Sequence, residues 1–390
     1  MAAKAILAMA MTMTMTMKSM MAAIPLLTLV AIGADAIVSA AAAATPDRQQ
    51  LVAPFPLASH PERNNGKTAC DIAIPAPVVT LDLSSIYEDG DATHSTIDAD
   101  HKNRYDAALK ATRTFESLVA SQASIYTLSD GKRLDAAACA LKAMDVWAKG
   151  QALSDLKTRQ SHLSATRIIA GTAMAYMQTR SAAPLLHLDT GPIDAWLTTL
   201  ADATIPVYTD GKDRTSDRQN HRYWGGFAVA AVGVAVDRPD FLKFGMDSYT
   251  LGIDQVTADG ALPLELARAK KARDYHLVAL APLVMLASLG EANGYHPLSQ
   301  GNGALQRLVR FTLASLHDPS RIDHLAGTPQ LGLPQGDDGL IRGDRIAWLP
   351  AYLALVPADR ARYAALAEKR LSSANLGGRM TMLYTRPDKH

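Results

Sequence analysis

Several features that mark particular classes of protein are missing from this chain. It has only two cysteines, 6% aromatic residues and a formal net charge of +1 over 390 residues. The lack of a basic excess argues against nucleic-acid binding, and the 48% hydrophobic content argues against a disordered chain. No phosphate-binding glycine loop, His-Glu-x-x-His helix or Cys-x-x-Cys pair is present, so we expect neither a metal site nor a cofactor. Because the net charge is close to zero, the protein has no general positive field, and any anionic ligand must be held by cationic side chains near it.

The first 44 residues have the composition of a cleaved export signal. Lys4 and Lys18 supply positive charge, a short apolar run covers 24–32, and small residues follow up to Ala44. This order is typical of a secretory signal peptide, and the run is short for a membrane span. We therefore expect a periplasmic or secreted protein that is not bound to the membrane after cleavage near Ala44.

Export affects how the two cysteines are interpreted. Cys70 and Cys139 would reach an oxidising compartment, where pairing is favoured. A disulfide is the preferred interpretation, and two separate buried thiols remain the alternative.

Helical periodicity dominates the chain beyond an extended, proline-containing leader at 45–69. Segments rich in alanine and leucine predict helices at 105–112, 134–153, 162–179, 227–236, 241–256 and 262–289, and a last one at 358–371. Alternating strand patterns are scarce. With no heptad repeat and no domain break, residues 70–390 are predicted to form one all-α domain, either a helical toroid around a central cleft or an irregular bundle.

One acidic, non-periodic segment stands apart at 86–96, with the sequence Ile-Tyr-Glu-Asp-Gly-Asp-Ala-Thr-His-Ser-Thr. A solvated surface loop is one interpretation. The other is a lid that closes over a substrate, with Tyr87 as its contact.

Two short stretches carry reactive side chains. The first, 219–226, places Asn220, His221, Tyr223 and Trp224 at the start of a very apolar helix, where His221 and Trp224 share a face. A helix cap followed by a buried tryptophan is the alternative interpretation.

In the second stretch, 264–276, Arg268 and Tyr275 are seven residues apart, which puts them on one face if the helix is continuous. A nearby cation favours the phenolate, so Tyr275 is a candidate general base. A structural cation–π pair is the alternative, and the remaining cations here, Lys270, Lys271 and Arg273, are interpreted as a solvated face.

Taken together, these residues resemble a known family. The motifs Asn220-His221-x-Tyr223-Trp224, Glu265-x-x-Arg268 and Tyr275-His276 are similar to those of polysaccharide lyase family 5, the poly(β-D-mannuronate) or alginate lyases. Weaker similarity extends from Cys70 to near Tyr384. The resemblance implies an incomplete α/α toroid, a periplasmic location and metal-free β-elimination.

The resemblance also assigns roles to the candidate site residues. Tyr275 matches the family's catalytic base and acid, and Asn220, His221 and Arg268 match the residues around the substrate carboxylate. Trp224, with Tyr223 and Tyr87, is expected to contact the sugar. Where family members often carry a lysine just before the Tyr-Glu motif, this chain has Ser84-Ser85-Ile86, which weakens the implied mannuronate preference.

The expected partner is an anionic polysaccharide, bound by a monomer. Other 4-linked uronate polymers, such as polyglucuronate or hyaluronan, are alternative substrates. A non-catalytic periplasmic polysaccharide-binding protein is a second alternative. A hydrolase is a third, and it would need two carboxylates such as Glu265 with Asp217 or Asp254.

Overall fold

The computed structural model describes residues 50–59, 68–336 and 341–385, and the regular structure in these ranges is almost entirely helical. Long helices that follow each other in the chain pack together as hairpins. The four pairs are α2 (Lys110–Leu128) with α3 (Leu134–Lys149), α4 (Arg159–Thr179) with α5 (Gly191–Thr209), α6 (Asn220–Val236) with α7 (Pro239–Ile253), and α9 (Ala272–Ala292) with α10 (Ala304–Ala314). A short parallel pair joins β1 (Thr80–Leu81) to β2 (Asp155–Leu156). The all-α prediction is confirmed.

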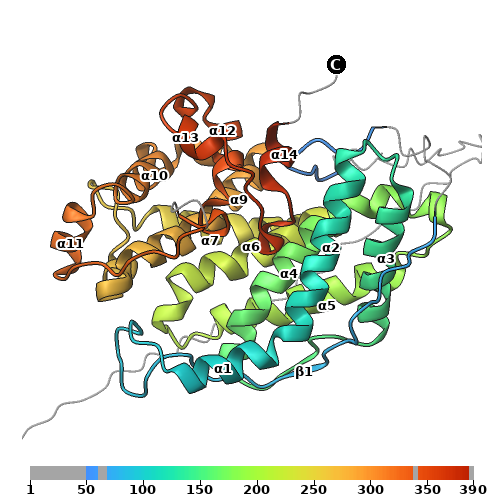
Figure 1. Cartoon of the computed structure of the whole chain (residues 1–390), viewed down its shortest axis with the longest axis horizontal. Coiled ribbons are helices and arrows are strands. Elements are labelled where there is room, and N and C mark those ends of the chain that lie inside the picture. The colour runs from blue at the N-terminus through green and yellow to red at the C-terminus, as the bar shows by residue number, and fades with distance from the viewer. Residues whose placement is uncertain (1–49, 60–67, 337–340, 386–390) are drawn as a thin grey trace, which may run out of the picture. The chain divides into compact units, whose positions relative to one another are not determined.

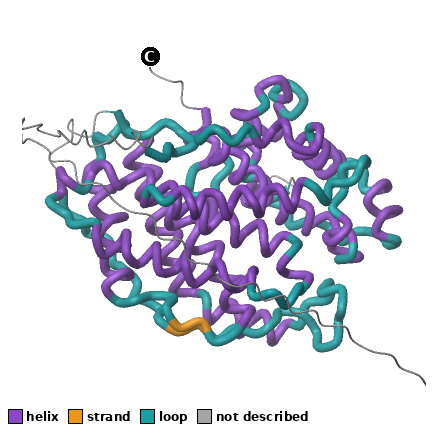
Figure 2. The backbone as a smooth tube through the Cα atoms, turned by 180° about the vertical axis from the view of Figure 1, so that it is seen from behind, coloured by secondary structure: helices purple, strands orange, loops and turns teal. Residues whose placement is uncertain are grey.

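The hairpins stand side by side in a double row of helices (Figure 1, Figure 2). In the inner row α2, α4, α6 and α9 each pack against the next, and α3, α5, α7 and α10 cover them. α12 (Leu349–Leu355) packs against α9 and α14 (Met380–Thr385), and α14 in turn packs against α2. The arrangement is the α/α toroid predicted above. It is incomplete because short helices and loops stand where a last hairpin would close it.

α6 is the central helix, and most of its residues are buried on every side. Its contact with α7 is close because glycines lie where the two helices meet. A Cβ on Gly226 would lie 2.4 Å from the Ser248 Cβ, and one on Gly245 would lie 2.4 Å from the Ala230 Cβ. This packing fixes the start of α6, where Asn220 and His221 are found.

The prediction of one continuous helix at 262–289 is wrong. This stretch is divided into α8 (Pro263–Leu266), a 3-10 turn (Ala269–Lys271) and α9. Ala269 has a φ of +47°, which a right-handed helix cannot accommodate. The Gln330 side chain stabilises this break, since its amide donates to the Ala269 carbonyl and its oxygen accepts from the Arg273 N–H. α9 is apolar and long enough to cross a membrane, but most of it is buried in the protein core.

The prediction of a last helix at 358–371 is also wrong. The structure has only a 3-10 turn (Pro357–Asp359) and the short α13 (Ala364–Ala367) there. Alanine gives this stretch a high helix propensity, but of its residues only Tyr363 and Leu371 are buried. A helix with so little apolar surface to bury gains little from tertiary packing. The final helix is α14, and α1 (Ala99–Ala108) and α11 (Ser320–Ala326) complete the set.

The predicted signal peptide lies outside the described residues. The leader that follows is extended but, contrary to the prediction, partly packed. Phe55 is 6% exposed and lies edge-on to the Tyr384 ring. The N–H of Leu51 donates to the Asp237 carboxylate, and Val52 exchanges hydrogen bonds with the Asn293 side chain. These contacts fasten the leader to the ends of α6 and α9.

Cys70 and Cys139 form a disulfide in the structure. It joins the extended stretch before β1 to α3, and the Trp147 indole also holds that stretch by donating to the Pro75 carbonyl. The bond closes a loop with a sequence separation of 69 residues. In the chain-entropy model such a closure stabilises the fold by about 4 kcal/mol.

We expect the protein to carry this disulfide when it is produced in an oxidising compartment. Thiol alkylation followed by mass measurement should add two labels only after reduction. The Cys70→Ser/Cys139→Ser variant should lose about 4 kcal/mol of unfolding free energy in urea titration. Two alkylated thiols in the unreduced protein would show that the bond does not form.

Candidate active site

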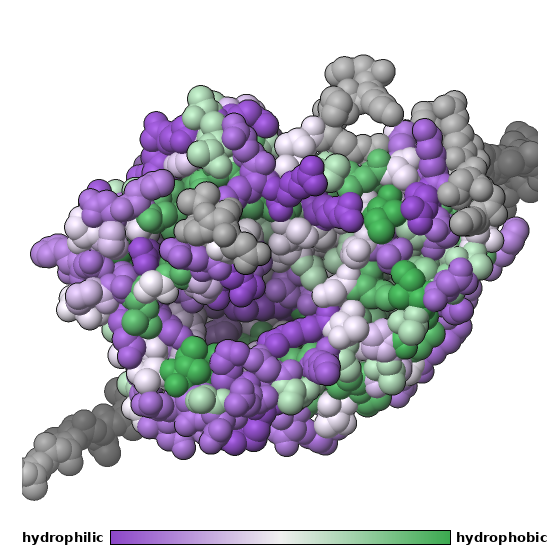
Figure 3. Space-filling view, viewed as in Figure 1, coloured by the Kyte–Doolittle hydropathy of each residue, from purple (hydrophilic) through white to green (hydrophobic). Residues whose placement is uncertain are grey.

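A cleft of about 660 Å³ opens among the segment around 85–105, α4, the start of α6 and the start of α9. Figure 3, which has the same viewing direction as Figure 1, shows a hollow near the centre of the molecule, and the residues inside it are hydrophilic. Of the residues predicted from the sequence, Tyr275, His221, Arg268 and Tyr87 line this cleft. The fold therefore brings together side chains from positions 87, 221, 268 and 275.

Tyr275 and Arg268 are stacked. The guanidinium carbon of Arg268 lies 3.8 Å from the Tyr275 ring centroid, and Arg268 is 7% exposed. The sequence argument placed both residues on one helix face, but Arg268 precedes α9 and is brought to Tyr275 by the turn at Ala269. The proximity was predicted, although its structural cause is a break in the helix.

The Tyr275 hydroxyl also forms a hydrogen bond with the Tyr87 hydroxyl. Burial raises the pKa of Tyr275 well above its ordinary value, and the Tyr87 hydroxyl acts in the same direction. The Arg268 guanidinium opposes this shift, because its charge stabilises the phenolate. Arg268 is thus the neighbour whose charge most favours an ionised Tyr275.

The segment 86–96, for which a lid was one interpretation, contacts these residues. An antiparallel bridge between Tyr87 and Ile97 closes it, and the Asp91 carboxylate accepts the backbone N–H groups of Thr93, Ser95 and Thr96. Besides the Tyr87–Tyr275 hydrogen bond, two contacts tie it to neighbouring residues: the Arg268 guanidinium donates to the His94 carbonyl, and Lys270 Nζ donates to the Thr96 hydroxyl. The segment is therefore hydrogen-bonded to the site residues while much of it, including 88–90, remains exposed to solvent.

His221 stands at the start of α6 and faces the cleft. Burial lowers its pKa to about 3, and the charges of Arg167, Arg268 and Arg159 act in the same direction. The imidazole is therefore neutral near pH 7. A neutral imidazole can donate one hydrogen bond and accept another, but it adds no charge to the cleft.

Asn220 is fully buried behind the cleft and does not line it. Its backbone N–H donates to Glu265 Oε1 at 2.8 Å, and its side-chain Nδ2 lies 3.1 Å from each Glu265 oxygen. Burial raises the pKa of Glu265 to about 7, and the bonds from Asn220 oppose that shift. The pair links α8 to the first residue of α6 and so positions His221 beside the stretch that carries Arg268.

The two predicted sugar-contacting aromatics of α6 are not in the cleft. Trp224 is 5% exposed and its indole N–H donates to the Val278 carbonyl, while Tyr223 is 1% exposed and its hydroxyl donates to the Arg218 carbonyl. Both belong to the hydrophobic core. The alternative interpretation, a helix cap followed by a buried tryptophan, is therefore correct for the tryptophan only. Gln219 precedes the helix without a side-chain capping hydrogen bond, and His221 does face the cleft.

Six cations that the sequence argument did not select as site residues do line the cleft: Lys102, Arg159, Arg167, Arg214, Lys271 and Arg345. Arg167 stacks on Trp224 with its guanidinium carbon 5.0 Å from the ring, and Lys271 Nζ lies 4.9 Å from the centre of the Tyr87 ring. Lys271 had been interpreted as part of a solvated face, which is wrong. No local motif marks Arg159, Arg167 or Arg345, because the fold brings them from separate segments.

Carboxyl groups are scarce in the cleft. Among the described lining residues only Asp274 carries one, and it is ion-paired with Arg345 at 3.1 Å. Of the carboxylates considered for a hydrolase, Glu265 is buried against Asn220 and Asp217 is ion-paired with Arg159 and Arg214. Its described lining residues therefore do not include the two opposed carboxyl groups that glycoside hydrolysis ordinarily uses. Within the described ranges, no group of three or more His, Cys, Asp or Glu side chains could hold a metal ion.

Comparison with known proteins agrees with this geometry. The family model described as alginate lyase matches residues 37–322. The chain belongs to the alginate lyase family. An alginate lyase from Pseudomonas syringae pv. syringae B728a is 32% identical over 322 residues, covering 80% of this chain and 82% of that protein. An alginate lyase from Cobetia marina is 30% identical, covering 78% and 80%.

Solved structures with the same fold include alginate lyase A1-III complexed with a tetrasaccharide. Its TM-score is 0.69 at 23% identity, and the match covers 85% of this chain and 91% of that one. The family resemblance inferred from the motifs and the toroid fold are both confirmed. At this level the chain is a polysaccharide lyase of the alginate lyase family, with an anionic polysaccharide as its substrate class.

Proposed function

We propose that the chain cleaves 4-linked polyuronates of the poly-β-D-mannuronate type by syn β-elimination. The observation that carries the proposal is the stacked Tyr275–Arg268 pair in a cleft rich in cations and poor in carboxylates. A lyase needs a base beside the C5 proton and positive charge beside the carboxylate. A hydrolase needs two carboxyl groups.

In the proposed reaction, the ionised oxygen of Tyr275 takes the C5 proton of the uronate. The electron pair left at C5 forms the C4–C5 double bond as the C4–O bond breaks. The departing oxygen takes the proton back from the Tyr275 hydroxyl, which restores the phenolate and leaves an unsaturated uronate end. One side chain thus acts first as base and then as acid.

The C5 proton is acidic enough only if the adjacent carboxylate is neutralised as negative charge develops on it. Arg268 can do so by charge, and His221 can do so as a neutral hydrogen-bond donor. Preorganised donors of this kind are typically worth ~3–4 kcal/mol each in the transition state. Asn220 contributes indirectly in this proposal, since its amide is bonded to Glu265 and holds the start of α6 in place.

We further propose that the protein acts after export. The disulfide between Cys70 and Cys139 supports this, because such bonds persist in oxidising compartments and are rare in the cytosol.

The substrate preference follows from stereochemistry. A single Tyr275 can reach the C5 proton and the C4 oxygen only when both lie on the same side of the ring, as they do in β-D-mannuronate and β-D-glucuronate. α-L-Guluronate places them on opposite sides and needs a second base. We expect initial rates on guluronate-rich polymer to be at least about a hundredfold lower than on mannuronate-rich polymer, the lower end of what a placed acid–base group contributes.

The test is the near-UV absorbance of unsaturated uronate ends on mannuronate-rich, guluronate-rich and glucuronate polymers. Faster cleavage of the guluronate-rich polymer would overturn the single-tyrosine mechanism. Strong cleavage of glucuronate polymers would leave the mechanism intact and widen the specificity. β-D-Glucuronate differs from β-D-mannuronate only at C2, away from the reacting C4 and C5 atoms.

A further inference from the structure

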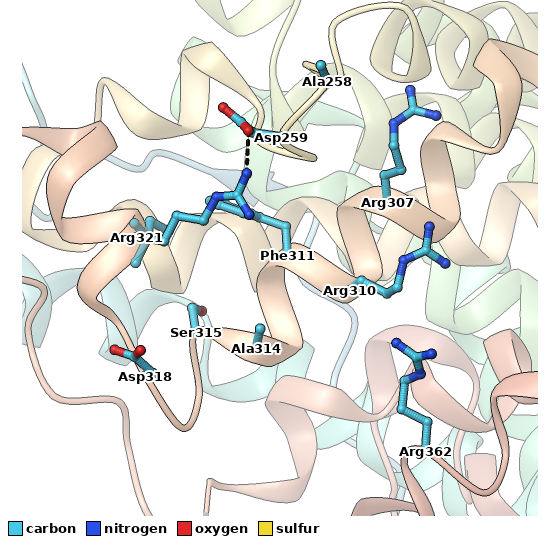
Figure 4. A pocket seen from close by; sticks show the side chains of 11 residues that line it. Ala258, Asp259, Arg307, Arg310, Phe311, Ala314, Ser315, Asp318, Arg321 and Arg362 are labelled. Atoms are coloured by element: carbon cyan, nitrogen blue, oxygen red, sulfur yellow. Dashed lines mark hydrogen bonds and ion pairs between the residues drawn. The ribbon is translucent and has the colours of Figure 1, made fainter.

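A second cavity, separate from the cleft, lies between α10, α11 and the segment before α13, and it has a volume of about 400 Å³. Its residues include four arginines (Figure 4), namely Arg307, Arg310, Arg321 and Arg362. None of its lining residues also lines the cleft. Cavities of about 300–1,000 Å³ are typical of small-molecule sites.

Two carboxylates, Asp259 and Asp318, line the cavity together with the four arginines, so its positive charge is only partly compensated. Arg321 is ion-paired with Asp259, as the dashed line in Figure 4 marks. Arg307 donates to the carbonyls of Gly301 and Asn302, which are neutral, and its buried Nε has no partner among the described residues. Arg307 therefore keeps its charge available to a ligand.

The two remaining guanidinium groups are still less engaged. Arg362 is 3.8 Å from Asp359, which already accepts a hydrogen bond from the Tyr352 hydroxyl. The Arg310 side chain makes no hydrogen bond or ion pair with any residue in the described ranges and is exposed. Arg310 lies one helical turn from Arg307, so their side chains project from the same face of α10, as Figure 4 shows.

The cavity also has an apolar wall. Phe311 is 7% exposed, and Ala258 and Ala314 lie beside it. Cations above an apolar surface suit a ligand that has both carboxylates and an apolar ring face, which is the composition of a uronate saccharide. A free inorganic anion would use the arginines but leave the apolar wall uncovered.

We propose that this cavity is a second binding site for carboxylate-bearing saccharide, which holds a stretch of polyuronate outside the cleft. This inference rests on the proposed function for its choice of ligand. A site of this kind would keep a long polymer on the protein between cleavage events, because a second attachment raises the effective concentration of chain near the cleft. An oligosaccharide too short to reach from the cleft to this cavity would gain nothing.

The test compares two variants that each remove two positive charges. Arg310→Gln/Arg362→Gln alters the cavity, and Lys132→Gln/Lys142→Gln alters exposed lysines elsewhere. On long mannuronate-rich polymer the first variant should raise KM about tenfold at unchanged kcat, well within what linked sites can provide. On a tetrasaccharide its kinetics should match wild type. The lysine variant should match wild type on both substrates. Equal KM values on the polymer for the two variants would overturn the proposal.

Polymer binding is measured separately from turnover, as the retardation of each protein during electrophoresis in gels that contain polyuronate. If no polyuronate is cleaved but the arginine variant alone loses retardation, the proposed function fails and the second site stands. If cleavage is confirmed and both variants are retarded equally, the second site fails alone. If inorganic phosphate abolishes the retardation and a mannuronate tetrasaccharide at equal charge concentration does not, the cavity is a general anion site and the saccharide assignment is wrong.

Discussion

Replacing Tyr275 with phenylalanine is expected to reduce turnover on mannuronate-rich polymer by roughly 10³-fold or more, because one oxygen serves as both base and acid and each proton transfer is typically worth 10²–10⁴-fold. The ring remains, so the stacking of Arg268 at 3.8 Å from its centre remains as well. Thermal stability and polymer binding should stay near wild type. The measurements are the initial rate from unsaturated uronate ends, the melting temperature and gel retardation.

Two matched tyrosine-to-phenylalanine variants serve as controls. Tyr105 lines the same cleft, and its hydroxyl is hydrogen-bonded to the Ser164 hydroxyl at 2.8 Å. Tyr87 contacts Tyr275 from the segment 86–96. Both should keep turnover within about tenfold of wild type, since neither oxygen moves a proton of the substrate in the proposed mechanism. If Tyr275→Phe falls in that same range, a different residue is the base, and His221 is then the next candidate.

The sequence predicted α3, α4 and α7 closely and the apolar part of α6, but the segments it named did not include α5 or α10. The helix predicted at 105–112 is wrong, because the chain breaks at Leu109 between α1 and α2. The prediction also failed where tertiary contacts override local propensity. The break at Ala269 depends on the Gln330 side chain, which lies 61 residues further along the chain. The stretch at 358–371 has helical composition but too little apolar surface to bury.

The residues of the candidate site also include some that the sequence predicted correctly and some that it did not. Tyr275, Arg268 and His221 could be selected because unusual side chains cluster near one another in the sequence. Tyr223 and Trp224 were selected by the same argument, yet they face the core, because residue type alone does not decide which side of a fully buried helix meets solvent. Arg159, Arg167 and Arg345 carry no local signal, since each is an isolated arginine that only the toroid brings to the cleft.

Replacing Arg268 with methionine is expected to lower kcat/KM by about 10²–10³-fold, the usual cost of removing one preorganised electrostatic donor. Two effects combine. The substrate carboxylate loses a cation, and Tyr275 loses the guanidinium that lowers its pKa against the effect of burial. With a higher phenol pKa, a smaller fraction of Tyr275 is ionised at any given pH below it. The rise of kcat/KM with pH should therefore move to higher pH.

The pH profile separates this role from a merely structural one. Arg268→Lys keeps the charge but loses the planar stacking, so its profile should move less than that of Arg268→Met. Lys271→Met removes another cleft cation, whose Nζ lies 4.9 Å from the centre of the Tyr87 ring. The charges that most lower the pKa of Tyr275 are those of Arg268 and Arg167. Lys271→Met can slow the reaction, but its profile should keep the wild-type position. A loss of rate in Arg268→Met with no displacement of the profile would mean that Arg268 serves the substrate carboxylate alone. An equal displacement in Lys271→Met would mean that the total charge of the cleft, and not the stacked guanidinium, sets the ionisation of Tyr275.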